Sequence, residues 1–194
     1  FQVLKIKLGS KDDKKIIEGL REVTDRPIRV DVNEGWKDKE QALDMINWLA
    51  DKGVEFVEQP MPAANLDDYR WLKERVRIPI MADESVHKIQ DVPALASGFH
   101  GINIKLMKCG GLQEALRLVA VARSLNLKLM LGCMIESSLA ISAAATICPL
   151  FDYADLDGNL LINNDPFSGL KLDGDRWLLS DQPGLGVKPN IPEW

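Results

Sequence analysis

The sequence predicts an α/β fold in which parallel strands and helices alternate to build a barrel. Short β-branched or apolar runs recur along the chain, each is followed by a helical pattern, and five of them carry an ionisable residue at their end. Strands joined by such short helical connections are expected to pair in parallel. Because the carboxyl ends of parallel strands meet at one rim, the ionisable residues should converge there, as in a barrel active site.

The strand-like runs number seven and lie at residues 2–8, 28–32, 54–58, 78–82, 101–106, 128–133 and 151–156. The clearest helix spans 112–125, where apolar residues recur at helical period after a turn at Gly110 and Gly111. Beyond residue 157 the pattern changes, and 169–179 alternates like a hairpin around Asp173 and Gly174. We therefore expect two regions, a partial barrel at 1–157 and a hairpin with an extended tail at 158–194.

The number of strands is one short of a closed barrel. A parallel barrel ordinarily has eight strands, and seven would leave two unpaired edges and an open core. We therefore expect an incomplete barrel that begins at its second strand. The preceding segment would either have been removed or travel as a separate chain.

Composition sets mild limits. The chain has 194 residues, 46% of them apolar, which is enough for one core, and its net charge of -5 gives no reason to expect nucleic acid or a membrane as a partner. Residues 1–7 have no features of a secretion signal, and no stretch approaches the length of a membrane span. Three cysteines without metal-type spacing favour reduced thiols and a cytoplasmic protein. Whether the chain forms a homo-oligomer is left open.

Lysines occupy the ends of two predicted strands. Lys5 and Lys7 lie two apart on the first strand, so their side chains share one face, and in a barrel one face is interior. Inward lysines need partners or a role. The alternatives are an edge strand that its lysines protect from aggregation and, for Lys105 on the fifth strand, a solvated strand end.

Carboxylates end three consecutive strands, at Asp31, Glu58 and Asp83. Each alone could cap the helix that follows it. Together they would repel one another unless a divalent cation neutralised them, and all-oxygen ligands favour Mg²⁺ before Mn²⁺. A metal ion beside lysines suits removal of a proton next to a carboxylate, since the ion stabilises the enediolate charge. The ion and a second lysine should lower a lysine pKa toward a useful range.

Together, the K-x-K strand, the D-x-N, E-Q-P and A-D-E-S strand ends and the N-I-K-x-x-K-x-G-G segment resemble the enolase superfamily. Within its muconate-lactonising subgroup, the chain is similar to the dipeptide epimerases of the L-Ala-D/L-Glu type. The resemblance covers about residues 3–157 and implies a (β/α)7β-type TIM barrel from strand 2 onward. The first barrel strand and the N-terminal capping domain of the family would then be missing.

The resemblance also implies roles for individual residues. Metal ligands would be Asp31, Glu58 and Asp83, the acid/base pair Lys7 and Lys105, and Lys5 would lie near the substrate carboxylate. The D-x-D pair Asp155 and Asp157 would hold the substrate ammonium group, although a turn-forming D-x-D-G is the alternative. Cys133 and Met134 are expected to line the substrate pocket, and Asn33 and Glu84 to support the metal ligands. Glu136 is expected to cap the next helix.

The implied reaction is a Mg²⁺-dependent 1,1-proton transfer that inverts the α-carbon of the second residue of a dipeptide such as L-Ala-L/D-Glu, through an enediolate. One alternative is a related elimination or cycloisomerisation, as in an o-succinylbenzoate synthase-like lyase, where one lysine transfers the proton. Another is a non-catalytic barrel fragment that serves as a binding or assembly subunit. The sequence does not specify which dipeptide is preferred.

Overall fold

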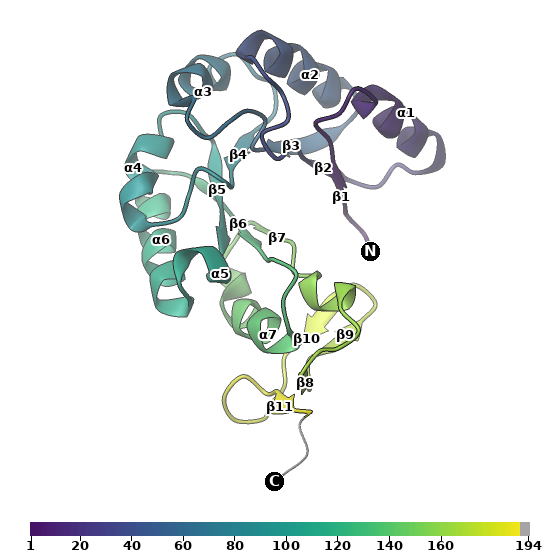
Figure 1. Cartoon of the computed structure of the whole chain (residues 1–194), viewed down its shortest axis with the longest axis vertical. Helices are drawn as coiled ribbons and strands as arrows, with labels where there is room; N and C mark the ends of the chain where they lie inside the picture. Colours follow the sequence, from purple (N-terminus) through teal and green to yellow (C-terminus); the bar gives the residue numbers. More distant parts are fainter. Residues whose placement is uncertain (191–194) are drawn as a thin grey trace.

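A computed structural model of the chain describes residues 1–190 and contains one parallel sheet of seven strands in chain order. The sheet curves into an arc with the helices on its outer side (Figure 1). The strands are β1 (Leu4–Lys7), β2 (Ile28–Asp31), β3 (Val54–Glu58), β4 (Ile80–Ala82), β5 (Gly101–Lys105), β6 (Lys128–Gly132) and β7 (Tyr153–Ala154). The prediction of seven parallel strands is confirmed, although most of the predicted runs extend past the observed strand ends.

Helices alternate with these strands and cover the convex face of the arc (Figure 1). They are α1 (Asp13–Val23), α2 (Lys39–Asp51), α3 (Leu66–Lys73), α4 (Val92–Leu95), α5 (Leu106–Cys109), α6 (Leu112–Ser124) and α7 (Ser138–Ile147), with short 3₁₀ turns η1 (Ile89–Asp91), η2 (Cys148–Leu150) and η3 (Gly158–Leu161). No helix in residues 1–190 is both long enough and apolar enough to cross a membrane. Within the same residues, β1 and β7 each have one neighbouring strand, so the arc is open between them.

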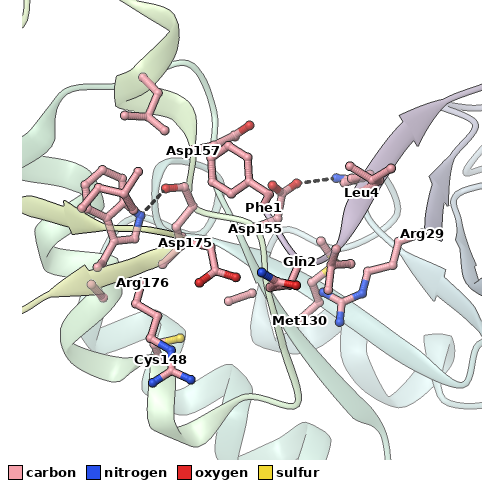
Figure 2. Close-up of a pocket in the computed structure, with 18 of the residues that line it drawn as sticks. Phe1, Gln2, Leu4, Arg29, Met130, Cys148, Asp155, Asp157, Asp175 and Arg176 are labelled. Carbon is pink, nitrogen blue, oxygen red and sulfur yellow. Dashed lines mark hydrogen bonds and ion pairs between the residues drawn. The ribbon is translucent and has the colours of Figure 1, made fainter. Parts of the chain in front are cut away.

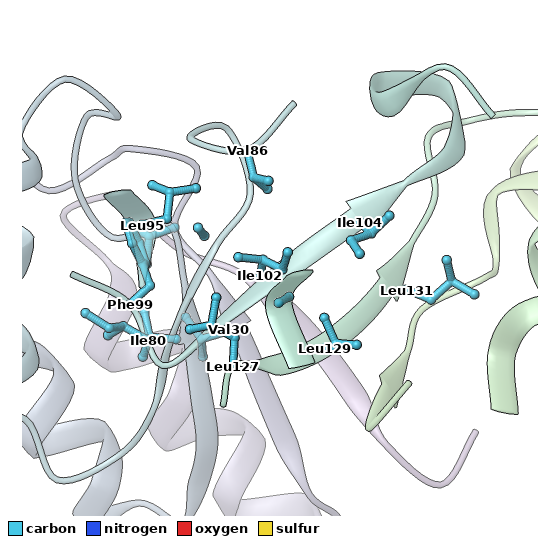
Figure 3. Close-up of a cluster of buried hydrophobic side chains, with 14 of the residues drawn as sticks. Val30, Ile80, Val86, Leu95, Phe99, Ile102, Ile104, Leu127, Leu129 and Leu131 are labelled. Carbon is cyan, nitrogen blue, oxygen red and sulfur yellow. The ribbon is translucent and has the colours of Figure 1, made fainter. Parts of the chain in front are cut away.

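The outward side chains of the strands form the main core against the helices. On β5 these are Ile102 and Ile104, and on β6 they are Leu129 and Leu131, all buried (Figure 3). Each such side chain stabilises the fold by about 1.5–3 kcal/mol relative to an exposed one. The core therefore lies outside the arc and leaves the inner face of the strands for other residues.

A smaller apolar layer lies on the inner face, because alternate residues of a strand point to opposite sides. Phe56, Met81 and Met130 are fully buried there, with Tyr153 packed against them. The guanidinium of Arg29 lies over the rings of Tyr153 and Phe56, at 4.8 and 5.5 Å from their centroids. This layer fills the inner face on the amino-terminal side of the charged rim.

The chain continues after β7 into two small antiparallel pairs. β9 (Lys171–Asp173) pairs with β10 (Arg176–Leu178) around Gly174, whose φ of 62° suits the tight turn, and β8 (Phe167–Ser168) pairs with β11 (Lys188–Pro189). The indole Nε1 of Trp177 on β10 donates to the Leu156 carbonyl at 2.7 Å. This contact fastens the β9–β10 hairpin to the segment that follows β7.

The helix caps use carboxylates other than those at the strand ends. Asp38 accepts the Gln41 amide at 2.7 Å at the start of α2, and Asp165 accepts the Ser138 amide at 2.8 Å at the start of α7. The prediction that Glu136 caps α7 is therefore wrong, because Asp165 reaches that helix end from the later chain. The alternative in which Asp31 caps the next helix is likewise not observed.

Candidate active site

Three carboxylates meet at the carboxyl-terminal rim of the sheet. Asp31 and Glu58 are the last residues of β2 and β3, and Asp83 follows the last residue of β4. One oxygen from each lies within 4.8 Å of the others, and the three residues are at most 2% exposed. The convergence expected from the strand ends is therefore present, as a compact set of oxygen donors.

Two lysines lie at opposite ends of this trio. Lys7 Nζ on β1 is 2.7 Å from Asp31 Oδ2, and Lys105 Nζ on β5 is 2.5 Å from Asp83 Oδ2. Since β1 and β5 flank the three strands that carry the acids, the two ammonium groups approach the trio from its two sides. Lys7 is largely exposed, with 66% of its side chain accessible, whereas 11% of the Lys105 side chain is.

Lys5 reaches into the inner face below Lys7. Its Nζ is 3.0 Å from Glu58 Oε2, 3.0 Å from Asp155 Oδ2 and 3.4 Å from Asp31 Oδ2. Both β1 lysines thus reach the same Asp31 oxygen, as expected for side chains that share one strand face. Burial works to lower the pKa of Lys5, but the surrounding carboxylates, Glu58 first, hold it above its usual range. Lys5 is therefore an interior cation, and the edge-protection alternative does not describe it.

Glu58 is the acid whose surroundings fit a cation best. Its Oε1 accepts from Asn103 Nδ2 at 2.6 Å, whereas its buried Oε2 has the Lys5 ammonium at 3.0 Å as an ion-pair partner and accepts no hydrogen bond. Burial, and then the charges of Asp31 and Asp83, raise the pKa of Glu58 to about 7 against the opposing effect of Lys5. A buried carboxylate oxygen without a hydrogen bond, beside two further carboxylates, is a donor set that suits a hard divalent cation.

Asp83 is held by cations on both of its oxygens. Lys105 contacts Oδ2, while Lys108 Nζ contacts Oδ1 and also donates to the Asp83 carbonyl at 2.6 Å. Burial alone would raise the pKa of Asp83, but these ammonium groups hold it below its usual range. The pKa of Lys105 is in turn raised, because contact with Asp83 outweighs burial. The expected lowering of a lysine pKa by a bound ion and a second lysine concerns the metal-loaded site and stays a prediction.

Sequence reasoning missed three residues that contact the rim acids: Asn103, Lys108 and Gln59. Asn103 precedes Lys105 by two residues and so shares its inward face, and Lys108 follows one helical turn later on α5. Both belong to the N-I-K-x-x-K segment, and their spacing from Lys105 could have predicted that they reach the same acids. Gln59 follows Glu58 directly in E-Q-P, and its contacts are described below.

Asn33 and Glu84 join the rim as expected for residues next to the acids. Lys7 Nζ donates to Asn33 Oδ1 at 2.6 Å, and Asn33 Nδ2 donates to Glu84 Oε1 at 2.8 Å. The Asn33 amide also donates to Asp31 Oδ1 at 3.0 Å. Asn33 has a φ of 46°, a conformation that costs energy for a non-glycine residue and that clusters at functional sites. The pair fixes Lys7 beside Asp31.

The residues expected to contact substrate lie around the ends of β6 and β7. Asp155 pairs with Lys5, and Asp157 Oδ1 lies 3.9 Å from Cys133 Sγ. Burial raises the pKa of Cys133 to about 12, which keeps its thiol protonated, and burial followed by the Asp155 charge raises the pKa of Asp157. Met134 is 48% exposed next to Cys133. Figure 2 shows Asp155 and Asp157 on the segment that follows β7.

Comparisons with known proteins agree with this geometry. The family model described as "Enolase C-terminal domain-like" matches residues 1–194. A curated relative, the L-Ala-D/L-Glu epimerase of Bacteroides thetaiotaomicron, is 52% identical over 96% of this chain and 49% of its own length. The chain thus spans about half the length of the curated relatives it matches.

Two solved structures are similar over nearly the whole chain. The dipeptide epimerase of Methylococcus capsulatus, complexed with Mg and the dipeptide L-Arg-D-Lys, is 37% identical with a TM-score of 0.86 over 96% of this chain and 56% of its own. The L-Ala-D/L-Glu epimerase of Bacillus subtilis, in a substrate-liganded complex, is 34% identical with a TM-score of 0.90 over 96% of this chain and 55% of its own. The chain therefore belongs to the enolase C-terminal domain-like family, in the branch of isomerases that includes the dipeptide epimerases.

Proposed function

We propose that the protein carrying this chain is a Mg²⁺-dependent dipeptide epimerase that inverts the α-carbon of the second residue of a dipeptide such as L-Ala-L/D-Glu. The observation that supports this most directly is the placement of Lys7 and Lys105 at opposite ends of the carboxylate trio. Inversion by proton transfer needs one base on each face of the carbon, and a barrel strand on each side of the substrate can supply them.

The metal ligands in this proposal are Asp31, Glu58 and Asp83. Their buried oxygens form a donor set for Mg²⁺, and Mn²⁺ can replace it because it accepts the same oxygen ligands. The bound ion supplies positive charge to the substrate carboxylate as that group gains negative charge during the reaction. Asn103 orients Glu58, and Lys108 orients Asp83.

The proton steps belong to Lys7 and Lys105. In one direction, the neutral Nζ of one lysine takes the α-proton, the electron pair of the C–H bond moves toward the carboxylate, and an enediolate forms. The ammonium of the other lysine then returns a proton to the opposite face of the same carbon, which restores the carboxylate with inverted configuration. The roles exchange in the reverse direction.

Substrate contacts follow from the charges around the rim. Lys5 is the interior cation nearest Glu58 and Asp31 and contributes positive potential where a substrate carboxylate would lie. Asp155 and Asp157 provide carboxylates for the α-ammonium group of a dipeptide, and Cys133 and Met134 border the same side. The relatives named as dipeptide epimerases support this choice of substrate class.

We also propose that a further polypeptide segment, in the same chain or in a separate one, supplies an eighth strand between β1 and β7. A cavity of about 770 Å³ lies there, lined by Leu4 and Lys5 of β1, by Ala154 and Asp155 at β7, and by Trp177 of β10 (Figure 2). An extended segment would find backbone partners on both open strand edges. A cytoplasmic location belongs to the proposal, since the chain's three free thiols suit a reducing compartment.

The test is proton NMR in D₂O with a small panel of L-Ala-containing dipeptides, following the α-proton signal of the second residue. The chain is measured alone and together with the part of the Bacteroides thetaiotaomicron relative that it does not cover, each with Mg²⁺ and with EDTA. Loss of the α-proton signal that requires Mg²⁺ supports the function, and activity that appears only in the mixture supports the eighth strand. Absence of exchange with every dipeptide in a folded, Mg²⁺-loaded mixture would refute the substrate class.

A further inference from the structure

Gln59 occupies a fully buried position at the point where two of the acid-bearing strands end. It follows Glu58 directly and has a φ of 36°, a costly conformation for a residue with a side chain. Its backbone amide donates to the Met81 carbonyl at 2.9 Å, and its carbonyl accepts the Glu34 amide at 2.9 Å. The backbone of Gln59 is therefore tied to the chain on both sides of β3.

The side chain of Gln59 reaches the next strand end. Asp83 lies one residue beyond β4, where the regular sheet pairing has stopped, and its amide donates to Gln59 Oε1 at 2.9 Å. The Ser85 amide donates to the same oxygen at 3.2 Å. This one acceptor thus replaces the missing sheet partner and sets the backbone from which the Asp83 carboxylate projects.

The amide nitrogen of Gln59 anchors that acceptor. Nε2 lies within hydrogen-bond distance of Tyr69 Oη at 2.8 Å, Ser85 Oγ at 2.8 Å and the Met61 carbonyl at 3.1 Å. An amide nitrogen has two hydrogens, so any two of these acceptors satisfy it. The orientation of Gln59 therefore survives the loss of one acceptor, whereas the Asp83 amide depends on Gln59 Oε1.

We infer that Gln59 is a positioning residue for the metal site, acting by holding the backbone of Asp83 in register with Glu58. This inference rests on the metal site proposed above. Residues that orient metal ligands typically contribute about 10–100-fold to metal affinity. The Gln59 side chain contacts the Asp83 backbone amide, which carries one of the proposed ligands, so its effect should appear in metal binding itself.

The test measures Mn²⁺ affinity by electron paramagnetic resonance of the free ion, with Mg²⁺ competition, for the chain completed as described above. Gln59→Met keeps the length of the side chain and removes the acceptor, and should weaken Mn²⁺ binding by roughly 10–100-fold. Gln59→Asn keeps an amide but is one methylene shorter, and it should weaken Mn²⁺ binding by about 10-fold or more. This variant replaces Gln59→Met in the test if Gln59→Met does not fold.

The matched control is Tyr69→Phe. It disturbs the same buried network, where Tyr69 Oη also accepts the Met61 amide at 2.9 Å, but it leaves Gln59 with two acceptors and Asp83 untouched. Its thermal midpoint should fall, while its Mn²⁺ affinity should stay within about threefold of the unaltered protein. Equal affinities in the Gln59 variants and Tyr69→Phe would overturn the positioning role. Failure of the unaltered protein to bind Mn²⁺ would instead refute the metal site itself.

Discussion

The two faces of the same strands carry opposite chemistry. On β5, Ile102 and Ile104 point outward into the helix-covered core, while Asn103 and Lys105 point inward to the rim acids. The period of two along a strand makes this separation available at every position. The outer face therefore accounts for most of the stability. The inner face brings charged groups together, and burying them costs desolvation free energy.

The inner face is internally neutralised. The trio of acids and Asp155 lie among Lys5, Lys7, Lys105 and Lys108, and the ion pairs join different elements, including β1 and the segment that follows β7. Buried ion pairs contribute little net stability because desolvation offsets their attraction. Substitutions on the two faces should therefore separate metal binding from the free energy of unfolding.

The largest effect is expected for Glu58→Gln on the inner face. The neutral isostere removes a central metal ligand, and Mn²⁺ affinity should fall by at least about 100-fold. The thermal midpoint without metal should stay within a few degrees, because Lys5 keeps its ion pairs with Asp31 and Asp155 and glutamine keeps the side-chain shape. Retention of near-normal Mn²⁺ affinity in a titration would show that Glu58 is not a ligand.

The converse effect is expected on the outer face, for Ile102→Ala. The cavity should lower the free energy of unfolding by about 2–5 kcal/mol in urea titrations, since Ile102 is fully buried. Mn²⁺ affinity of the folded fraction should not change. Ile16→Ala, at an exposed position of α1, is the matched control and should change stability by about 0.5 kcal/mol or less. Weaker Mn²⁺ binding in folded Ile102→Ala would contradict the separation of the two faces.

Gly132→Ala tests the inner face without changing a charge. A Cβ at this position on β6 would lie 2.5 Å from Asn103 Oδ1, so Asn103 would have to move from Glu58. We expect a loss of about 1–3 kcal/mol in stability, together with weaker Mn²⁺ binding.

Gly19→Ala is the control for this substitution. Gly19 lies inside α1 with nothing within 4 Å of an added Cβ, and alanine there should stabilise the protein by about 0.5–1 kcal/mol. Unchanged Mn²⁺ affinity in Gly132→Ala would mean that Asn103 does not orient Glu58.

The smallest effect is expected from His100, which lies at the amino-terminal end of the strands, on the pH dependence of the free energy of unfolding. His100 Nδ1 accepts the Ile80 amide at 3.1 Å, and burial, followed by the charges of Lys73 and Lys128, lowers the pKa of His100 to about 4. The unfolded chain then binds more protons between about pH 6.5 and pH 4. The free energy of unfolding should therefore fall as the pH drops through this window, and level off below it.

With allowance for partial exposure, the loss should be on the order of 1–2 kcal/mol. Urea titrations at several pH values measure it, with His100→Asn expected to flatten the dependence because asparagine can accept the same amide. His87→Asn, at an exposed position, is the control and should leave the dependence intact. A pH dependence that persists in His100→Asn would assign it to other groups.

Much of the fold was predictable because strand periodicity and strand-end charges are local signals. The seven strands, their parallel order and the convergence of Asp31, Glu58 and Asp83 follow from short runs of sequence. The predicted positions of the strand ends were less accurate, because the end of a strand depends on where the neighbouring strand stops pairing with it. β4, for instance, begins at Ile80 because of pairing with β3 and β5.

Contacts between distant segments were not predictable in the same way. Asp165 caps α7 from the later chain, and the cap expected from Glu136 is absent, because nothing in the local sequence distinguishes the two acids. The role of Gln59 likewise depends on Asp83, which is remote in sequence, and on a buried network. The raised pKa of Lys105 results from its direct contact with Asp83, a distance that sequence spacing does not give.

The most direct test of two-base epimerisation asks whether Lys7 and Lys105 each exchange the α-proton of a different epimer. The α-proton exchange of L-Ala-L-Glu and L-Ala-D-Glu in D₂O is followed by NMR for Lys7→Ala and Lys105→Ala, with Lys15→Ala on the exposed face of α1 as the control. The proposal predicts that each active-site variant loses exchange with a different epimer, while Lys15→Ala exchanges both. Loss of all exchange in one variant and normal exchange of both epimers in the other would contradict it, and would favour chemistry that uses a single lysine.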